Sequence, residues 1–196
     1  MKIKNLAKRK VAYFLSNNMN KFREAARILE KYGIIIVLIR LKKKEIQNDS
    51  IEKIAKVSAE EAAEELNLPV VTEDAGLFID ALNGFPGPYS SFTYRTIGVE
   101  GILKLMSGVE NRKAKFKSAV AYAEPSGESR IFSGGVSGEI SVTAKGDKGF
   151  GFDPIFQPYD YKGRTFAELD TDEKNAISHR GLAFRKFAEW YISKVG

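Results

Sequence analysis

The feature that most constrains the fold is an opening alternation of strand-like and helix-like segments. Residues 11–15 form a short apolar run typical of a buried strand, and residues 16–21 are turn and helix N-cap formers. Apolar side chains recur at helical spacing over residues 22–32, before Gly33 stops the helix. The β-branched run 34–41 predicts a second strand, buried on both faces. This order predicts an α/β fold.

The middle of the chain predicts further elements of the same fold. Residues 50–66 are rich in Glu, Ala and Lys and contain no Gly or Pro, which favours a helix. Residues 68–72 predict a third strand, which ends at Glu73 and Asp74. Residues 84–89 have the sequence Gly-Phe-Pro-Gly-Pro-Tyr and predict a loop of fixed geometry.

The second half of the chain predicts antiparallel strands and a closing helix. Over residues 115–122, Phe, Ser, Val and Tyr at the even positions alternate with Lys and Ala at the odd positions, which is typical of a strand. A turn signal follows at residues 125–128, and residues 130–142 continue extended. Helical spacing occurs near residues 99–106 and again over residues 179–195, where the predicted helix is amphipathic.

Composition limits the number of domains and the choice of metal. With 196 residues, 43% of them hydrophobic, residues 1–196 are expected to form a single domain. No apolar run approaches the roughly 18 residues of a membrane span and no signal-peptide pattern follows the basic start, so we expect a soluble, cytoplasmic protein. Without cysteine, and with a single histidine, any metal must rely on oxygen ligands, which suits Mg²⁺ or Mn²⁺.

The charge balance suits an anionic partner without identifying one. The net charge is +6 and the pI is about 9.3, but basic and acidic residues are interleaved along the chain. Only residues 8–10 and 42–44 form basic clusters, and neither contains the aromatic residues that single-strand binders use. A solvated charged surface is therefore favoured over a nucleic-acid platform.

Two segments predict a phosphate site with a metal beside it. Residues 16–21 lie where a strand passes into a helix, so helix N–H groups together with Ser16, Asn18 and Lys21 suit a phosphate, although a plain helix N-cap fits equally well. Asp74 ends a predicted strand, and Glu45 also follows one. Carboxylates beside a phosphate require a bridging cation such as Mg²⁺, whereas the alternative interpretation is an ordinary turn.

Two later segments suit a planar base. Residues 150–154 place two phenylalanines and an acid around a glycine, which fits either base stacking or a glycine-rich turn with core phenylalanines. Lys174, His179 and Arg180 gather hydrogen-bond donors near the start of the last helix, where Ser178 is a candidate N-cap. These donors would match a purine carbonyl, and the alternative is a surface helix start with an incidental histidine.

The order of these segments resembles the inosine triphosphate pyrophosphatase, or Ham1-like, family over nearly the whole chain. The similar motifs are Ser16-x-Asn18-x-x-Lys21, residues 73–77, residues 84–90, residues 150–154 and Ser178-His179-Arg180. The resemblance implies an elongated mixed sheet with flanking helices, two lobes around a central substrate cleft, and a homodimer. It also implies hydrolysis of non-standard purine triphosphates such as ITP, dITP and XTP to the monophosphate and pyrophosphate.

The resemblance also implies roles for individual residues. Glu45 and Asp74 would bind Mg²⁺, with Asp74 and Lys21 as catalytic residues. Many members of the family carry a further phosphate-binding lysine where this chain has Ser58. Lys53 and Lys56 are the candidates to substitute for that lysine. The implied substrate-binding residues are Ser16, Asn17, Asn18, Met19, Asn20, Lys21, Ala75, Phe150, Gly151, Phe152, Asp153, Lys174, His179 and Arg180. Of these, Ser16, Asn18 and Lys21 would hold the phosphates, Phe150 would stack on the base, and Phe152, Asp153, Lys174, His179 and Arg180 would complete the base pocket.

Two alternatives remain open at this point. One is a related septum-inhibitor-type pyrophosphatase that acts on other nucleotides, which the Ser-His-Arg segment at residues 178–180 disfavours. The other is a basic nucleic-acid-binding module without catalysis, which the ordered acidic residues disfavour. Binding that weakens steeply with salt, without pyrophosphate release, would support the second.

Overall fold

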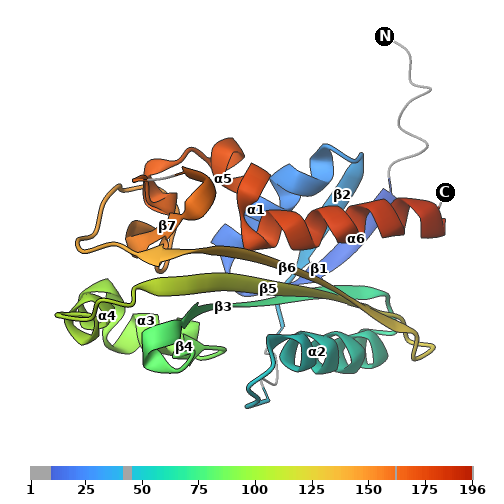
Figure 1. Ribbon diagram of the computed structural model, residues 1–196. Coiled ribbons are helices and arrows are strands. Elements are labelled where there is room, and N and C mark those ends of the chain that lie inside the picture. The colour runs from blue at the N-terminus through green and yellow to red at the C-terminus, as the bar shows by residue number, and fades with distance from the viewer. Residues whose placement is uncertain (1–9, 42–45, 162, 196) are drawn as a thin grey trace, which may run out of the picture.

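The computed structural model describes residues 10–41, 46–161 and 163–195. In this part of the chain a seven-stranded mixed sheet has the order β2-β1-β3-β5-β6-β7, and β4 pairs with β3 alone. Helices α1, α5 and α6 lie on one side of the long strands, and α2 lies on the other (Figure 1). The predicted fold class, α/β with an elongated mixed sheet and flanking helices, is confirmed.

The N-terminal strand, helix and strand form as predicted. Strands β1 (Lys10–Leu15) and β2 (Ile34–Ile39) are parallel, and α1 (Met19–Glu30) connects them. The prediction that the second strand is buried on both faces is wrong, because one face of β2, which is also an edge strand, is partly exposed. Ile35 and Val37 are each 39% exposed, while Ile34 and Ile36 pack into the core. The continuous apolar run therefore reflects one buried and one half-exposed face.

Strand β3 (Val70–Ile79) is the long central strand, and it continues through the acidic pair. The prediction that this strand ends at Glu73 and Asp74 is wrong, because β5 (Lys113–Ala123) pairs with it antiparallel along its whole length. On its other side, β3 pairs with β1 only at Val71. The next partner on that side is β4 (Pro86–Gly87), whose pairing with β3 begins at Leu77. One edge of β3 is thus interrupted at the acidic pair.

Helix α2 (Ile51–Leu66) packs closely on the sheet because its inward face is mostly alanine. Ser50 caps its start, since Ser50 Oγ accepts a hydrogen bond from Lys53 N at 3.2 Å. The hydroxyl of Thr72 donates to the Ala55 carbonyl at 2.7 Å, which identifies the face of β3 that α2 covers. The small residues in this contact are Ala55, Ala59, Ala62 and Ala63 of α2 and Ala119, Ala121 and Ala123 of β5.

The antiparallel half of the sheet also forms as predicted. Strand β6 (Ser129–Ile140) pairs with β5 after a turn, and β7 (Phe156–Pro158) pairs with β6. Two short helices, α3 (Ser90–Thr96) and α4 (Gly98–Leu105), follow β4. Near the C-terminus come α5 (Thr171–Ile177), which was not predicted, and α6 (His179–Val195), whose bounds agree with the prediction.

Two of the apolar clusters lie toward opposite ends of the sheet, and the division into two lobes stays a prediction. One contains Phe14, Leu29, Phe184 and Phe187 and joins β1, α1 and α6. The other contains Leu77, Phe116, Phe156 and Phe166 and lies toward β7. Helix α6 begins against β6, where a Cβ added to Gly134 would overlap the His179 carbonyl.

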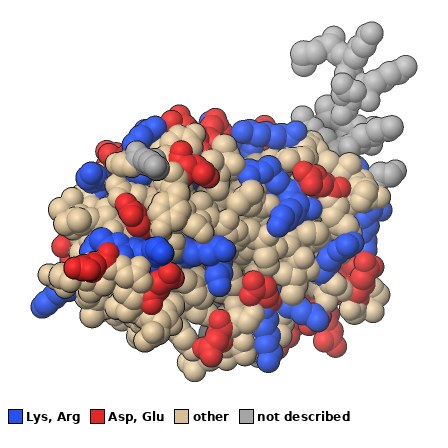
Figure 2. Space-filling model, viewed as in Figure 1, with Lys and Arg blue, Asp and Glu red and all other residues tan. Residues whose placement is uncertain are grey.

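The surface carries mixed charge. On the face shown in Figure 2, Lys and Arg side chains are interspersed with Asp and Glu. None of the described helices is both long enough and apolar enough to cross a membrane.

Candidate functional site

The site lies where the edge of β3 is interrupted. Strand β1 ends at Leu15 and the chain turns into α1 there, so residues 16–21 face the open edge of Glu73 and its neighbours. The Lys21 ammonium contacts the Glu73 carbonyl at 3.3 Å. The predicted phosphate loop and the acidic pair are therefore brought together, although by the end of β1 and not by the end of β3.

The phosphate loop is organised as a helix N-cap. Asn18 Oδ1 accepts hydrogen bonds from the backbone N–H groups of Asn20, at 2.9 Å, and Lys21, at 3.2 Å. The backbone N–H of Asn18 donates to Ser16 Oγ at 3.1 Å, and the Asn17 amide donates to the Leu41 carbonyl at 3.0 Å. The cap interpretation thus holds, and phosphate binding by the same loop stays a prediction.

The two adjacent acids point to opposite faces of the sheet because successive residues of a strand alternate. Glu73 is buried on the α6 side, where its carboxylate contacts Ser118 Oγ at 2.7 Å, Arg180 at 3.0 Å and Lys21 at 2.9 Å. Burial raises the pKa of Glu73, but the positive charges of Arg180 and Lys21 lower it by more. The pKa of Glu73 therefore lies well below its usual range. Asp74 lies on the α2 side, like Thr72.

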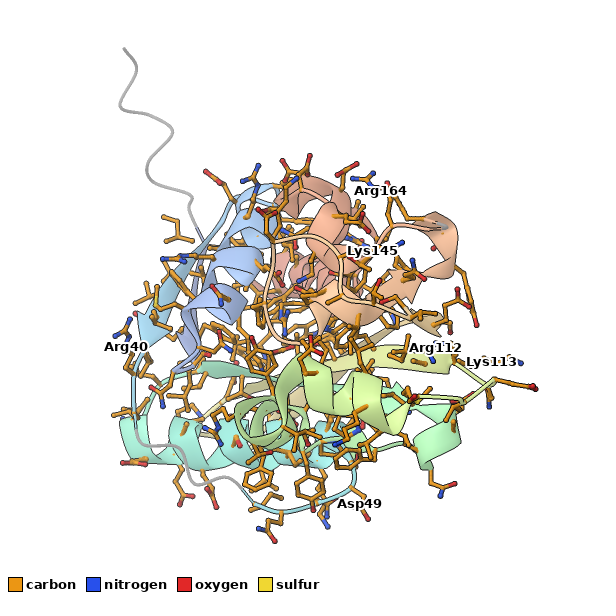
Figure 3. The ribbon with its side chains drawn as sticks, turned by 90° about the vertical axis from the view of Figure 1, so that its left-hand side faces the viewer. Arg40, Asp49, Arg112, Lys113, Lys145 and Arg164 are labelled. Atoms are coloured by element: carbon orange, nitrogen blue, oxygen red, sulfur yellow. The ribbon has the colours of Figure 1, made fainter. Side chains whose placement is uncertain are left out.

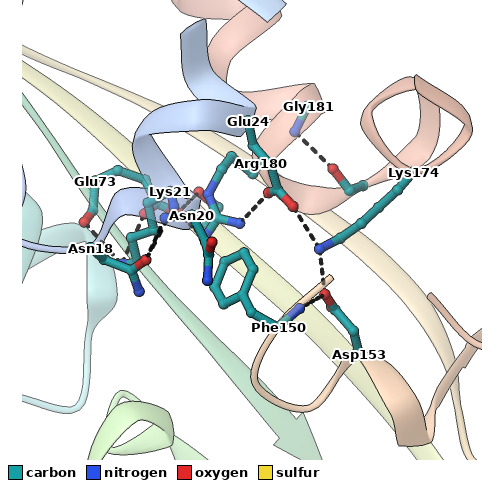
Figure 4. A network of polar contacts seen from close by, with 12 residues as sticks. Asn18, Asn20, Lys21, Glu24, Glu73, Phe150, Asp153, Lys174, Arg180 and Gly181 are labelled. Atoms are coloured by element: carbon teal, nitrogen blue, oxygen red, sulfur yellow. Dashed lines mark hydrogen bonds and ion pairs between the residues drawn. The ribbon is translucent and has the colours of Figure 1, made fainter. Parts of the chain in front are cut away.

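A buried charge network of alternating sign extends from Glu73 to the loop that carries Phe150 (Figure 4). Arg180 joins Glu73 to Glu24, with 2.7 Å between Arg180 Nη1 and Glu24 Oε2. Lys174 then joins Glu24, at 2.7 Å, to Asp153, at 2.6 Å. In order along the contacts, the network is Lys21, Glu73, Arg180, Glu24, Lys174 and Asp153.

Burial and the paired charges set the protonation of this network. Burial raises the pKa of Glu24, but Arg180 and Lys174 bring it below its ordinary value. Burial lowers the pKa of Arg180, and the carboxylates of Glu73 and Glu24 raise it above its ordinary value. Burial also raises the pKa of Asp153, which Lys174 opposes. The cations of the network are therefore held by carboxylates from three separate parts of the chain.

The loop around Phe150 is fixed by Asp153. Asp153 Oδ2 accepts a hydrogen bond from the Phe150 backbone N–H at 2.7 Å. The loop approaches so closely that a Cβ added to Gly149 would overlap the Asp153 carboxylate. The half-buried Phe150 ring lies 4.8 Å from Lys174 Nζ and 5.4 Å from Arg180 Cζ. Phe150 thus presents a ring beside the two cations, a geometry that suits stacking on a base.

The neighbouring predicted residues differ in exposure. Phe152 is only 3% exposed and belongs to the apolar core, where its ring meets Tyr94 edge-on at 5.6 Å. Gly151 has a positive φ of 65° and carries the turn between the two phenylalanines. The roles of Phe152 and Gly151 in a base pocket stay predictions.

His179 is buried at the start of α6. Ser178 caps this helix as predicted, because Ser178 Oγ accepts a hydrogen bond from the Gly181 backbone N–H at 3.0 Å. The imidazole is 3% exposed and stacks on Phe116 with 4.6 Å between ring centroids. Burial, together with the nearby positive charges, lowers the pKa of His179 well below its ordinary value. Among the described residues, His179 Nδ1 and Arg180 Nε have no hydrogen-bond partner.

Glu24 is a central member of the network that the sequence analysis missed. It bridges Lys174 and Arg180 and is 6% exposed. The available signal was its spacing, since Glu24 lies one helical turn after Lys21 and both therefore face the same side of α1. A glutamate on the buried face of an amphipathic helix indicates a cationic partner elsewhere in the chain.

The remaining predicted residues are placed as follows. Glu45 lies outside the described residues, and within them no group of three or more His, Cys, Asp or Glu side chains is arranged to hold a metal. Ser58 is buried against the sheet at 2% exposure. Lys53 and Lys56 are exposed, and Lys56 pairs with Glu60 at 3.7 Å.

This fold and site define an α/β protein with a densely charged site at an interrupted sheet edge. The Ham1 family model matches residues 12–190. The chain belongs to the Ham1 family, as its motifs predicted.

Relatives match over most of their length. The chain is 51% identical over 182 residues to the dITP/XTP pyrophosphatase of Methanopyrus kandleri, covering 93% of this chain and 96% of the relative. It is 49% identical over 181 residues to the dITP/XTP pyrophosphatase of Ignicoccus hospitalis, covering 92% and 96%. Among solved structures, a HAM1 protein from Coxiella burnetii has a TM-score of 0.82 at 31% identity, covering 94% of this chain and 99% of that one.

Proposed function

We propose that this protein hydrolyses non-standard purine nucleoside triphosphates, namely ITP, dITP and XTP, to the monophosphate and pyrophosphate. The observation that carries this proposal is the buried charge network, which links an aromatic loop at Phe150 to a phosphate-type loop at Lys21 beside Asp74. The names of the two relatives, both dITP/XTP pyrophosphatases, support the same activity.

The base is proposed to stack on Phe150 and to be identified by donors from α5 and α6. Inosine and xanthine present a carbonyl acceptor at position 6, where adenine presents a donor. His179 Nδ1 and Arg180 Nε are buried without a hydrogen-bond partner among the described residues, which supports a role for them in contacting a ligand edge. The 2-amino group of guanine would be left buried and unpaired, which costs about 1–3 kcal/mol.

The triphosphate is proposed to run between the two lobes from Phe150 to residues 16–21. There it would meet the N-terminal end of α1, the Lys21 ammonium and the open edge of β3 at Ala75. Lys21 would offset the charge on the leaving pyrophosphate. Because the reaction separates two anions, positioning and charge neutralisation supply most of the rate enhancement.

Mg²⁺, or Mn²⁺ in its place, is the proposed cofactor, and the Asp74 carboxylate at the open edge of β3 supports it. Asp74 offers a carboxylate beside the backbone edge of β3, and Mg²⁺ in proteins is commonly held by one or two carboxylates together with substrate phosphates. Glu45, outside the described residues, is the proposed second carboxylate. Such a cation supplies charge neutralisation and a water of lowered pKa. The Asp74 carboxylate would accept the proton of the attacking water.

We also propose that residues 1–196 form one catalytic domain and that two copies form a homodimer without stably bound nucleic acid. Exposed apolar side chains on α3 and α4, among them Phe92 at 61% and Leu105 at 48%, support a protein–protein contact. The interspersed surface charges offer no support for a nucleic-acid platform on the face shown in Figure 2.

A four-nucleotide comparison tests the proposed function. Pyrophosphate release from ITP, XTP, GTP and ATP would be measured with Mg²⁺. We expect kcat/KM for ITP and XTP to be well above kcat/KM for GTP and ATP. Equal values for ATP and ITP would refute the donor-based recognition of the base. If none of the four nucleotides releases pyrophosphate, the proposed activity is wrong.

A further inference from the structure

The buried charge network supplies little net positive charge to a polyanion. Its three cations, Lys21, Lys174 and Arg180, are matched by its three carboxylates, Glu24, Glu73 and Asp153. Lys21 in particular is already paired with Glu73 at 2.9 Å. Beyond the proposed Mg²⁺ and the shared charge of Lys21, a triphosphate at the open edge of β3 would therefore be stabilised by a further cation from outside this network.

Lys117 is placed to supply that cation from the other side of the sheet. On the β5 ladder, Lys117 lies opposite Gly76, and Ala119 lies opposite Asp74. Asp74 and Lys117 are thus diagonal neighbours on the same face, a separation of about 7–8 Å between residues and somewhat less between Cβ atoms, which a long side chain bridges. This is the face of Thr72, whose hydroxyl contacts α2.

The surroundings of Lys117 leave its charge available. The side chain is half-buried, and its ammonium lies 4.4 Å from the centroid of the Phe78 ring. In residues 10–41, 46–161 and 163–195 it forms no ion pair with a carboxylate. A partly desolvated ammonium that rests on an aromatic face, without a counter-ion, is suited to an anionic ligand.

We propose that Lys117 binds the triphosphate, so that Lys21 and Lys117 contact it from opposite faces of the sheet at the open edge of β3. The proposal rests on the proposed function and adds a residue to its site. Because Lys117 and Asp74 are diagonal neighbours, the contact would be made to the phosphates next to the attacking water. Lys53 and Lys56 would not take this role, since both are exposed on α2 and Lys56 pairs with Glu60.

Matched lysine variants test the proposal. Lys117→Met keeps an apolar stem over Phe78 and removes the charge, and Lys117→Arg keeps the charge. Lys113→Met and Lys115→Met are controls on the same face of β5, farther from Asp74; Figure 3 shows Lys113 at the periphery, directed outward. With XTP, kcat/KM is expected to fall about 10- to 100-fold in Lys117→Met, partly recover in Lys117→Arg, and stay within about threefold in the controls.

A second measurement uses the wild-type protein and does not depend on turnover. The rate at which an amine-reactive acylating reagent modifies each lysine would be followed by peptide mass spectrometry, with and without magnesium pyrophosphate. Slower modification of Lys117, with unchanged Lys113 and Lys115, is expected.

The outcomes separate this proposal from the proposed function. Wild-type kcat/KM in Lys117→Met would overturn the role of Lys117, as would unchanged modification of Lys117 in the presence of magnesium pyrophosphate. If the methionine variant does not fold, the modification experiment decides. A wild-type protein that releases no pyrophosphate from any nucleotide, yet shows protection of Lys117, would refute the activity and keep the anion site.

Discussion

Burial of His179 makes the stability of this protein depend on pH in a way that can be calculated. His179 is the only histidine of the chain, so it dominates proton uptake on unfolding between about pH 5.5 and 7. Burial, Arg180 and Lys174 lower the pKa of its imidazole well below the ordinary value, while Glu73 opposes them. The folded state therefore keeps the ring neutral in this range, and the unfolded chain does not.

The sign and the size follow from this difference in pKa. The stabilisation is complete above the unfolded pKa of about 6.5 and is lost as the pH falls below it, because only the unfolded chain then gains a proton. The limiting slope is about 1.4 kcal/mol per pH unit. Integrated from pH 7.0 to 5.5, the free energy of unfolding is expected to fall by about 1.2 kcal/mol through His179 alone.

Urea unfolding at both pH values, on wild type and His179→Phe, measures this quantity. Phenylalanine keeps a planar ring against Phe116 and cannot titrate, and the acids of the network contribute alike to both proteins. The decrease between pH 7.0 and 5.5 is expected to be smaller in the variant by about 1.2 kcal/mol. Equal decreases in the two proteins would show that His179 titrates alike when folded and unfolded, and would refute the argument.

Three further predictions concern the site. Asp74→Asn should abolish most nucleotide turnover with little change in thermal midpoint, and a chelator should inactivate wild type until Mg²⁺ is restored; full turnover in either case removes the assigned roles. Glu24→Gln should lower the free energy of unfolding by about 3–5 kcal/mol in urea, against a negligible change for the exposed Glu30→Gln on the same helix. Gly149→Ala should lower both kcat/KM and the free energy of unfolding, because the position combines a positive φ of 73° with overlap of the new Cβ with the Asp153 carboxylate. The control Gly127→Ala has a φ of 88° and no atom within reach of the new Cβ. Similar losses in the two variants would show that the overlap with Asp153 has no effect.

Local signals predicted most of the elements. The opening strand, helix and strand and the final helix follow from apolar periodicity and from caps such as Asn18 and Ser178, which act within one turn of the chain. The course of β3 beyond Asp74 depends on pairing with β5, and the half-exposed face of β2 depends on which segments pack against it. Both depend on contacts between distant segments, which periodicity does not contain.

The candidate site shows the same division. The motifs indicated which segments meet, and the structure brings Lys21, Glu73, Asp153, Lys174 and Arg180 into one network. The identity of each partner was beyond the sequence, because it depends on side chains that approach from α1, β3, α5 and α6. The bridging role of Glu24, on the buried face of α1, was missed for this reason.

The pleat of β3 explains how neighbouring carboxylates take opposite roles. Glu73 turns to the α6 face, where Arg180 and Lys21 neutralise it, and Asp74 turns to the α2 face, where Lys117 is its diagonal neighbour. A shift of one residue in the register of β3 would exchange the two acids and leave Arg180 without its carboxylate. The hydrogen bonds of Ser118 to Glu73 and of Thr72 to α2 oppose such a shift from both faces. The chemistry proposed for Asp74 therefore depends on strand register as much as on the presence of the acidic pair.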